Sequence, residues 1–172
     1  MPRERIRKDI VYKFGELSEE AQEKALENLS DINVDNDWWD STYDDARNIG
    51  LEIDEFDVYR RTIGGRFTQS AEEVAKEIIK NHGEMCETYK TAENYLKELE
   101  AEKEKNMIEN KGEEFPEDFL DTEEIDAKFK HSLLVDYLTI LQSQYEHLTS
   151  KEGILETIKM NNYEFTEDGR IA

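Results

Sequence analysis

Hydrophobic and polar residues alternate with two different periods in the first fifty positions. A loose two-residue alternation over residues 6–14 predicts a β-strand. Apolar residues then recur every fourth position over residues 17–29, which predicts a helix with one narrow buried stripe and Ser18 as its N-cap. A second helix is expected over residues 37–48, with Trp39 facing the core.

The next segment has the pattern of a β-hairpin. Residues 51–58 form a predicted strand whose apolar parity changes, so we expect a β-bulge near residues 54–55. The glycine pair at residues 64–65 predicts a tight turn, followed by a short strand at residues 66–69.

Helical spacing dominates the remainder of the chain. Ser70 and Glu73 form a capping-box pattern that opens a helix ending near His82. Apolar positions separated by four and three residues over 85–99 predict a helical seam, and a long apolar helix is expected over 122–148. The last predicted elements are a helix around residues 154–160, opened by a capping box of Thr149 and Glu152, and a closing strand at residues 163–165.

These elements predict an α+β fold with about six helices, a small antiparallel sheet of three to four short strands and a C-terminal helical hairpin. Residues 1–85 are expected to form an acidic α+β region, and residues 86–172 a helical region. A flexible acidic linker is expected at about residues 104–121, where Pro116 disfavours helix. The length fits one compact unit.

Charge is distributed very unevenly along the chain. The 172 residues include 43 acidic and 22 basic side chains, giving a net charge of −21. Residues 16–57 carry −13 and residues 113–126 carry −8, so the remainder is neutral overall. Such a charge opposes binding to nucleic acid phosphates or anionic lipid. Without an apolar run of membrane-spanning length or a signal-peptide pattern, a cytoplasmic protein is expected.

The residues that usually carry chemistry do not form a recognisable motif. His82 and Cys86 have a ligand-like spacing, but a zinc site needs three or four ligands. Residues 31–42 match the acidic positions of a calcium loop but have Asn36 in place of its glycine and Thr42 in place of its final glutamate. We therefore expect no enzyme, catalytic residue, cofactor or metal, with a weak cation site at residues 31–42 as an alternative.

Three arginines, Arg60, Arg61 and Arg66, cluster on the predicted hairpin. Neutralisation of nearby carboxylates is the favoured interpretation, and contact with a phosphate or with a partner's carboxylate is the alternative.

The acidic block at residues 16–57 has the features of a binding surface. On a helix, carboxylates three or four residues apart lie about 5 Å from each other, and a DNA strand carries one charge about every 3.4 Å. Trp38 is a candidate anchor within this surface. The predicted partner-binding residues are Glu19, Glu20, Glu23, Glu27, Asp31, Asp35, Asp37, Trp38, Asp40, Asp44 and Asp45. The alternative is a solvated face that only keeps the protein soluble.

Three stretches of the chain resemble a family of small acidic proteins carried by phages and other mobile elements, some of them labelled antitoxin-like. They are KFGELSEEAQEKALENLSDINVDNDWWDSTYDDARNIGL, SAEEVAKEIIKNHGEMCETYKTAENYL and NNYEFTEDGR. By analogy of setting and charge, the resemblance implies a non-enzymatic, anti-CRISPR-like inhibitor that occupies the nucleic-acid groove of a basic host nuclease or CRISPR effector. The alternatives are an antitoxin-type partner of a basic toxin and a structural protein that forms a homodimer through residues 122–148.

Overall fold

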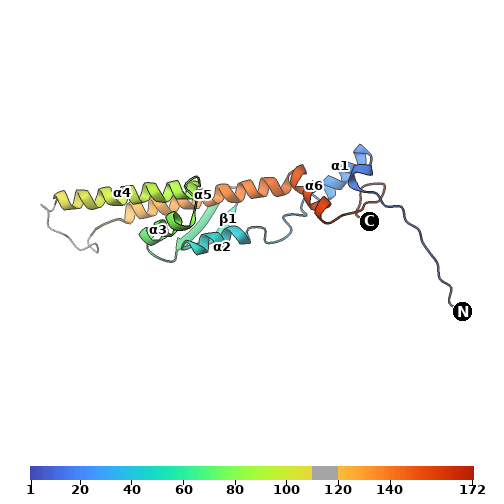
Figure 1. Cartoon of the computed structure of the whole chain (residues 1–172), viewed down its shortest axis with the longest axis horizontal. Coiled ribbons are helices and arrows are strands. Elements are labelled where there is room, and N and C mark those ends of the chain that lie inside the picture. The colour runs from blue at the N-terminus through green and yellow to red at the C-terminus, as the bar shows by residue number, and fades with distance from the viewer. Residues whose placement is uncertain (110–119) are drawn as a thin grey trace. The chain divides into compact units, whose positions relative to one another are not determined.

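The computed structural model describes residues 1–109 and 120–172. The described part contains η1 (Phe14–Glu16), α1 (Glu19–Asn28), α2 (Asp40–Asn48), β1 (Leu51–Asp57), β2 (Thr62–Phe67), α3 (Ala71–Asn81), α4 (Glu87–Glu109), α5 (Glu123–Thr149) and α6 (Lys151–Met160) (Figure 1). The predicted α+β class and the six α-helices are confirmed, whereas the described sheet has two antiparallel strands instead of three or four.

The chain folds into two compact units. The terminal unit comprises Met1–Trp38 and Gln144–Ala172, and the central unit comprises Trp39–Ser143. This grouping differs from the predicted boundary at residue 85, because the two ends of the chain share one hydrophobic cluster. The first six residues of the predicted linker, 104–109, are the last turns of α4, and residues 110–119 lie outside the described part.

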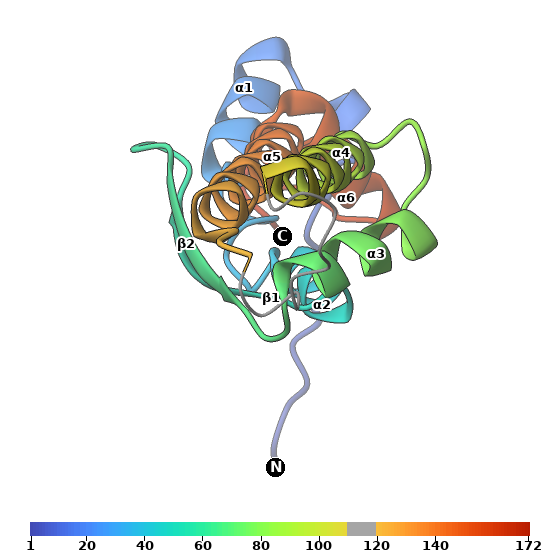
Figure 2. The same cartoon turned by 90° about the vertical axis from the view of Figure 1, so that its left-hand side faces the viewer.

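The core of the central unit forms where α4 and α5 run antiparallel. Both views show α4 beside α5, and Figure 2 shows the β1–β2 hairpin next to α5. Tyr95 of α4 stacks on Phe129 of α5 with ring centroids 4.4 Å apart, and Thr91 donates a hydrogen bond to Asp136. The fully buried side chains of this core include Ile49, Leu51, Val74, Ile78, Leu133, Tyr137 and Leu141.

The β-hairpin contains the predicted bulge but not the predicted turn. Ile53 pairs with Gly65 and Glu55 pairs with Gly64, which leaves Asp54 as the extra residue. The chain reverses over residues 58–61, where Arg61 has a left-handed backbone with φ of 56°.

The glycine pair lies inside β2, so the prediction of a turn at residues 64–65 was wrong. A Cβ atom on Gly65 would lie 2.6 Å from the Glu52 carbonyl oxygen and 3.0 Å from a methyl group of Leu134. Glycine at this position therefore allows both β1 and α5 to lie close to the β2 backbone. A Gly-Gly pair signals either a turn or a close approach, and its sequence does not distinguish them.

The terminal unit packs α1 against α6 and the C-terminal segment. The buried residues of this cluster are Leu17, Ala21, Ala25, Leu29, Ile154, Ile158 and Phe165. Ser18 caps α1 as predicted, accepting a 3.2 Å hydrogen bond from the Ala21 backbone. Ser150 caps α6 through the Gly153 backbone, so the predicted cap at Thr149 was one residue early.

The two predicted terminal strands, 6–14 and 163–165, are isolated bridges instead. Tyr12 and Phe165 exchange two backbone hydrogen bonds of 2.9 and 2.8 Å, and Phe165 makes a further bridge to Ile171. Because residues 1–10 are exposed, no strand among the described residues lies beside them to extend the pairing into a ladder.

Candidate functional site

The exposed carboxylates of α1 form the most continuous part of the predicted acidic surface. Glu19, Glu20, Glu23 and Glu27 are all exposed, on the helix faces opposite the stripe of small buried residues. Glu20 forms a surface ion pair with Lys24 at 3.5 Å. Within the described ranges, the other three carboxylates have no ion pair, so their charge is offset only by solvent.

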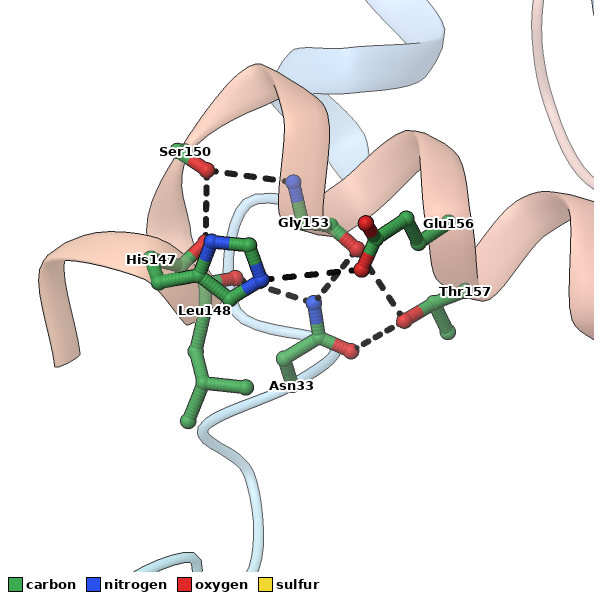
Figure 3. Close-up of polar contacts among 7 residues, drawn as sticks. All are labelled: Asn33, His147, Leu148, Ser150, Gly153, Glu156 and Thr157. Atoms are coloured by element: carbon green, nitrogen blue, oxygen red, sulfur yellow. Dashed lines mark hydrogen bonds and ion pairs between the residues drawn. The ribbon is translucent and has the colours of Figure 1, made fainter. Parts of the chain in front are cut away.

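The acidic loop after α1, residues 31–37, is fixed in place by one amide side chain. Asn33 donates hydrogen bonds to the backbone oxygens of Leu148, at 2.9 Å, and Gly153, at 3.2 Å. Its own amide oxygen accepts a 2.6 Å hydrogen bond from Thr157 (Figure 3). This loop is therefore held against the junction of α5 and α6 while Asp31, Asp35 and Asp37 stay exposed.

The same hydrogen bonds bear on the calcium-loop alternative. Asn33 would be the ligand at the third position of that loop, but its side-chain oxygen faces Thr157. Among residues 1–109 and 120–172, no three or more His, Cys, Asp or Glu side chains are grouped so that they could hold a metal ion. The described geometry thus gives no support to a cation site at residues 31–42.

The predicted partner-binding residues are divided between the two units. Those from Glu19 to Trp38 belong to the terminal unit, whereas Asp40, Asp44 and Asp45 lie on α2 of the central unit. Trp38 is half-buried and its ring lies 5.7 Å from that of Tyr145.

On α2, aromatic side chains lie beside exposed carboxylates. The rings of Trp39 and Tyr43 contact Phe56 of β1 edge-on, at centroid distances of 5.8 and 6.0 Å. Trp39, which was predicted to face the core, is half-buried and contacts Phe56 at the margin of that core. Asp44 pairs with Arg47, and Asp40 is exposed.

Asp45 differs from the other predicted residues because its carboxylate has partners within the central unit. Its Oδ2 accepts a 2.8 Å hydrogen bond from the Tyr137 hydroxyl and lies 3.4 Å from His82 Nε2. The contact with the His82 ring, followed by the Tyr137 hydrogen bond, holds the pKa of Asp45 below its usual value. Sequence reasoning missed this cluster because its members come from three distant segments without a shared motif.

His82 also lines a cavity of about 640 Å³ together with Cys86 and Asp136. Its Nδ1 lies 2.7 Å from the Thr88 hydroxyl, and its Nε2 faces Asp45. Only Nδ1 therefore has a hydrogen-bond partner, because the buried Nε2 makes no hydrogen bond to another described residue at its 3.4 Å distance from Asp45.

Two of the three hairpin arginines neutralise local carboxylates. Arg66 reaches Glu52 across the hairpin at 3.0 Å, and Arg60 lies 3.8 Å from Asp57. These contacts agree with the favoured interpretation for both residues. Arg61 is exposed at the turn and makes no ion pair to another described residue.

Comparison of the chain with protein-family profiles, curated proteins and solved structures gave no match. No helix in the described part of the chain is long and apolar enough to cross a membrane.

Proposed function

We propose that the protein acts by binding rather than by catalysis, and that the acidic surface of α1 and residues 31–37 engages the basic groove of a nucleic-acid-binding protein. The observation that carries this proposal is the combination of exposed, largely unpaired carboxylates on α1 with an adjoining acidic loop fixed by Asn33. A loop that is already ordered loses less conformational entropy on binding than a disordered acidic tail.

The charge spacing supports a groove that normally holds a nucleic acid strand. Glu19, Glu23 and Glu27 succeed one another at four-residue intervals, which places the Cβ atoms of neighbouring glutamates about 5–6 Å apart. This is somewhat wider than the roughly 3.4 Å charge spacing of a DNA strand, and the carboxylates of the loop add charge to the same unit. Such a surface would accelerate association with a basic partner and make the complex salt-sensitive.

In the setting suggested by the resemblance to phage and mobile-element proteins, the partner would be a host defence nuclease or CRISPR effector in the cytoplasm. A basic toxin would bind the same carboxylates, which is the antitoxin alternative. The identity of the bound protein separates the two.

A capture experiment with a defined competitor tests the proposal. The immobilised full chain is exposed to the phosphocellulose-binding fraction of a bacterial lysate, and bound proteins are eluted with salt or with duplex DNA at low salt. We expect the immobilised chain to retain basic nucleic-acid-binding proteins, and we expect duplex DNA to release them. Retention of no such protein, or release by salt but not by DNA, would contradict groove occupancy.

Matched variants localise the binding. One replaces Glu19, Glu23 and Glu27 of α1 with glutamine, and the control replaces the exposed Glu93, Glu100 and Glu104 of α4 with glutamine. Both remove three negative charges and keep good helix formers. We expect capture to weaken in the first variant and to persist in the second; equal weakening would show that total charge, and not this surface, does the binding.

A second candidate, self-association through α5, is favoured by two apolar side chains that face solvent. Val135 is 43% and Ile140 is 39% exposed. Sedimentation of the Val135→Lys/Ile140→Lys variant tests it, because a dimer that buries either side chain would become a monomer.

A further inference from the structure

The terminal unit contains an apolar groove that the acidic-surface proposal does not use. It has a volume of about 720 Å³ and lies between Lys13–Gly15, α6 and the residues that follow α6. Phe14, Leu155, Ile158 and Tyr163 supply its apolar lining. Of these, only Ile158 is fully buried, so the groove keeps aromatic and aliphatic surface in contact with water.

Basic side chains border this groove although the chain as a whole is strongly acidic. Lys151 and Lys159 each lie four residues from Leu155, so all three share one face of α6. The two lysines stand about 12 Å apart along the helix axis. Neither has an ion pair with another described residue, whereas Lys13 at the opposite wall pairs with Glu164 at 3.5 Å.

Two carboxylates also line the groove and are compatible with an anionic ligand. The carboxylate of Glu156 lies 3.5 Å from Nε2 of His147, near the α5–α6 junction (Figure 3). Glu152 lies three residues before Leu155 and therefore shares its face of α6, as the two lysines do. Three lysines and these two glutamates line the groove, so its charged side chains sum to +1 although the whole chain carries −21.

We propose that this groove binds a single-chain anionic amphiphile of the fatty-acid class. The hydrocarbon chain lies on Phe14, Leu155 and Tyr163, and the carboxylate is held by the α6 lysines. The volume lies within the range of roughly 300–1,000 Å³ that is usual for small-molecule sites. Burial of the exposed apolar lining favours the chain, and the unpaired lysines favour an anionic head group over a cationic or neutral one.

The net charge of the protein makes this proposal easy to test. A chain with charge −21 should attract a cationic amphiphile over most of its surface and repel an anionic one. We therefore compare dodecanoate with dodecyltrimethylammonium, which has the same chain length, by amide NMR of the full chain below the micelle concentrations. Dodecanoate is expected to bind saturably and to shift the signals of Phe14, Leu155 and Tyr163 selectively.

Two charge-reversal variants provide the control. Lys159 occupies the last turn of α6 and Lys80 the last turn of α3, and both are exposed. Lys159→Glu and Lys80→Glu therefore change the net charge by the same amount, and each places a negative charge in the last turn of a helix. We expect Lys159→Glu to weaken dodecanoate binding about five- to tenfold and Lys80→Glu to leave it nearly unchanged.

A third variant, Leu155→Gln, tests the apolar contact and should also weaken binding. The proposal is overturned if dodecanoate does not bind, if the cationic amphiphile shifts the same groove signals equally, or if both lysine variants behave alike. None of these results depends on the acidic surface of α1, so the two proposals can fail separately.

Discussion

The hydroxyl group of Tyr137 on α5 donates a 2.8 Å hydrogen bond to the carboxylate of Asp45 on α2. Tyr137 is fully buried, and burial together with this hydrogen bond raises the pKa of its hydroxyl, so the hydroxyl remains a donor throughout the ordinary pH range. Asp45 in turn faces His82, whose other ring nitrogen contacts Thr88 at the start of α4. The Asp45 carboxylate on α2 thus contacts α5 directly and, through His82, links the end of α3 to α4. Its protonation should therefore change the free energy of unfolding.

We expect Asp45→Asn to change the acid dependence of stability. Because the folded-state pKa of Asp45 lies below its usual value of 3.8, its contribution is present above about pH 4 and is lost as the pH falls through the lower folded-state value. Urea unfolding between about pH 4.5 and pH 2.5 should therefore give a shallower loss of unfolding free energy for Asp45→Asn than for the natural chain. The neighbouring Asp44→Asn variant is the control; equal slopes for all three chains would contradict the coupling.

The ionised carboxylate of Asp136 should lower the free energy of unfolding, which is opposite to the effect of Asp45. Burial raises the pKa of its carboxyl group, and nearby Glu87 adds to the effect, against the hydrogen bond from Thr91. The charged form of Asp136 is therefore disfavoured in the folded protein. The free energy of unfolding falls as the pH rises through the raised pKa and the group ionises. Asp136→Asn, which can still accept the Thr91 hydrogen bond, should be more stable than the natural chain at pH 7, by less than about 1 kcal/mol because the site is half-exposed.

The two chains should converge below about pH 4, where the natural carboxyl group is protonated in both the folded and unfolded states. Thermal unfolding at pH 7 and pH 3.5 measures the difference. A variant that is less stable at pH 7 would show that Asp136 is held charged by contacts stronger than its desolvation.

The two adjacent glycines of β2 should respond differently to alanine. Gly65→Ala brings a Cβ atom to 2.6 Å from the Glu52 carbonyl oxygen, whereas the nearest atom to a Cβ on Gly64 is 3.6 Å away on the flexible Glu55 side chain. We expect Gly65→Ala to lower the unfolding free energy by about 1–3 kcal/mol and Gly64→Ala to change it by less than about 1 kcal/mol. Denaturant unfolding of the two variants measures this, and similar losses at both positions would refute the close approach of β1 and α5 to Gly65.

Asn33→Ala should loosen the acidic loop and destabilise the terminal unit. The substitution removes two hydrogen bonds to backbone oxygens and the acceptor for Thr157, which together account for about 2–3 kcal/mol. Amide hydrogen exchange should become faster over residues 31–38. The exposed Asn28, at the end of α1, provides the Asn28→Ala control, which should leave exchange in this loop unchanged.

Local patterns in the sequence were sufficient to predict those helices and strands whose ends are determined by residues close to them in the sequence. Ser18 and Ser70 were identified as helix caps because a side chain must accept a hydrogen bond from a backbone group three residues later. The bulge at Asp54 followed from the parity change of β1. The helix predicted over 122–148 is α5, displaced by one residue at each end.

Features that depend on distant partners were not predictable in the same way. Gly65 of β2 is explained by Glu52 and Leu134, and the contacts of the exposed Asp45 by Tyr137 and His82. The alternation at residues 6–14 was genuine, but a strand requires a pairing partner, and only Tyr12 finds one. The apolar groove beside α6 likewise depends on Phe14 and Tyr163, which no local pattern relates to each other.

The terminal unit is assembled from two segments that are far apart in the sequence, so its folding during synthesis must wait for the second segment. The central unit, Trp39–Ser143, is continuous and can fold once its own residues have left the ribosome. Until residues 144–172 follow, the apolar stripe of α1 lacks its partners Ile154, Ile158 and Phe165. The nascent chain therefore presents a charged but incomplete acidic surface, and the loop at residues 31–37 acquires its Asn33 contacts only after α6 emerges. Binding that requires this ordered loop is thereby delayed until α6 has been synthesised.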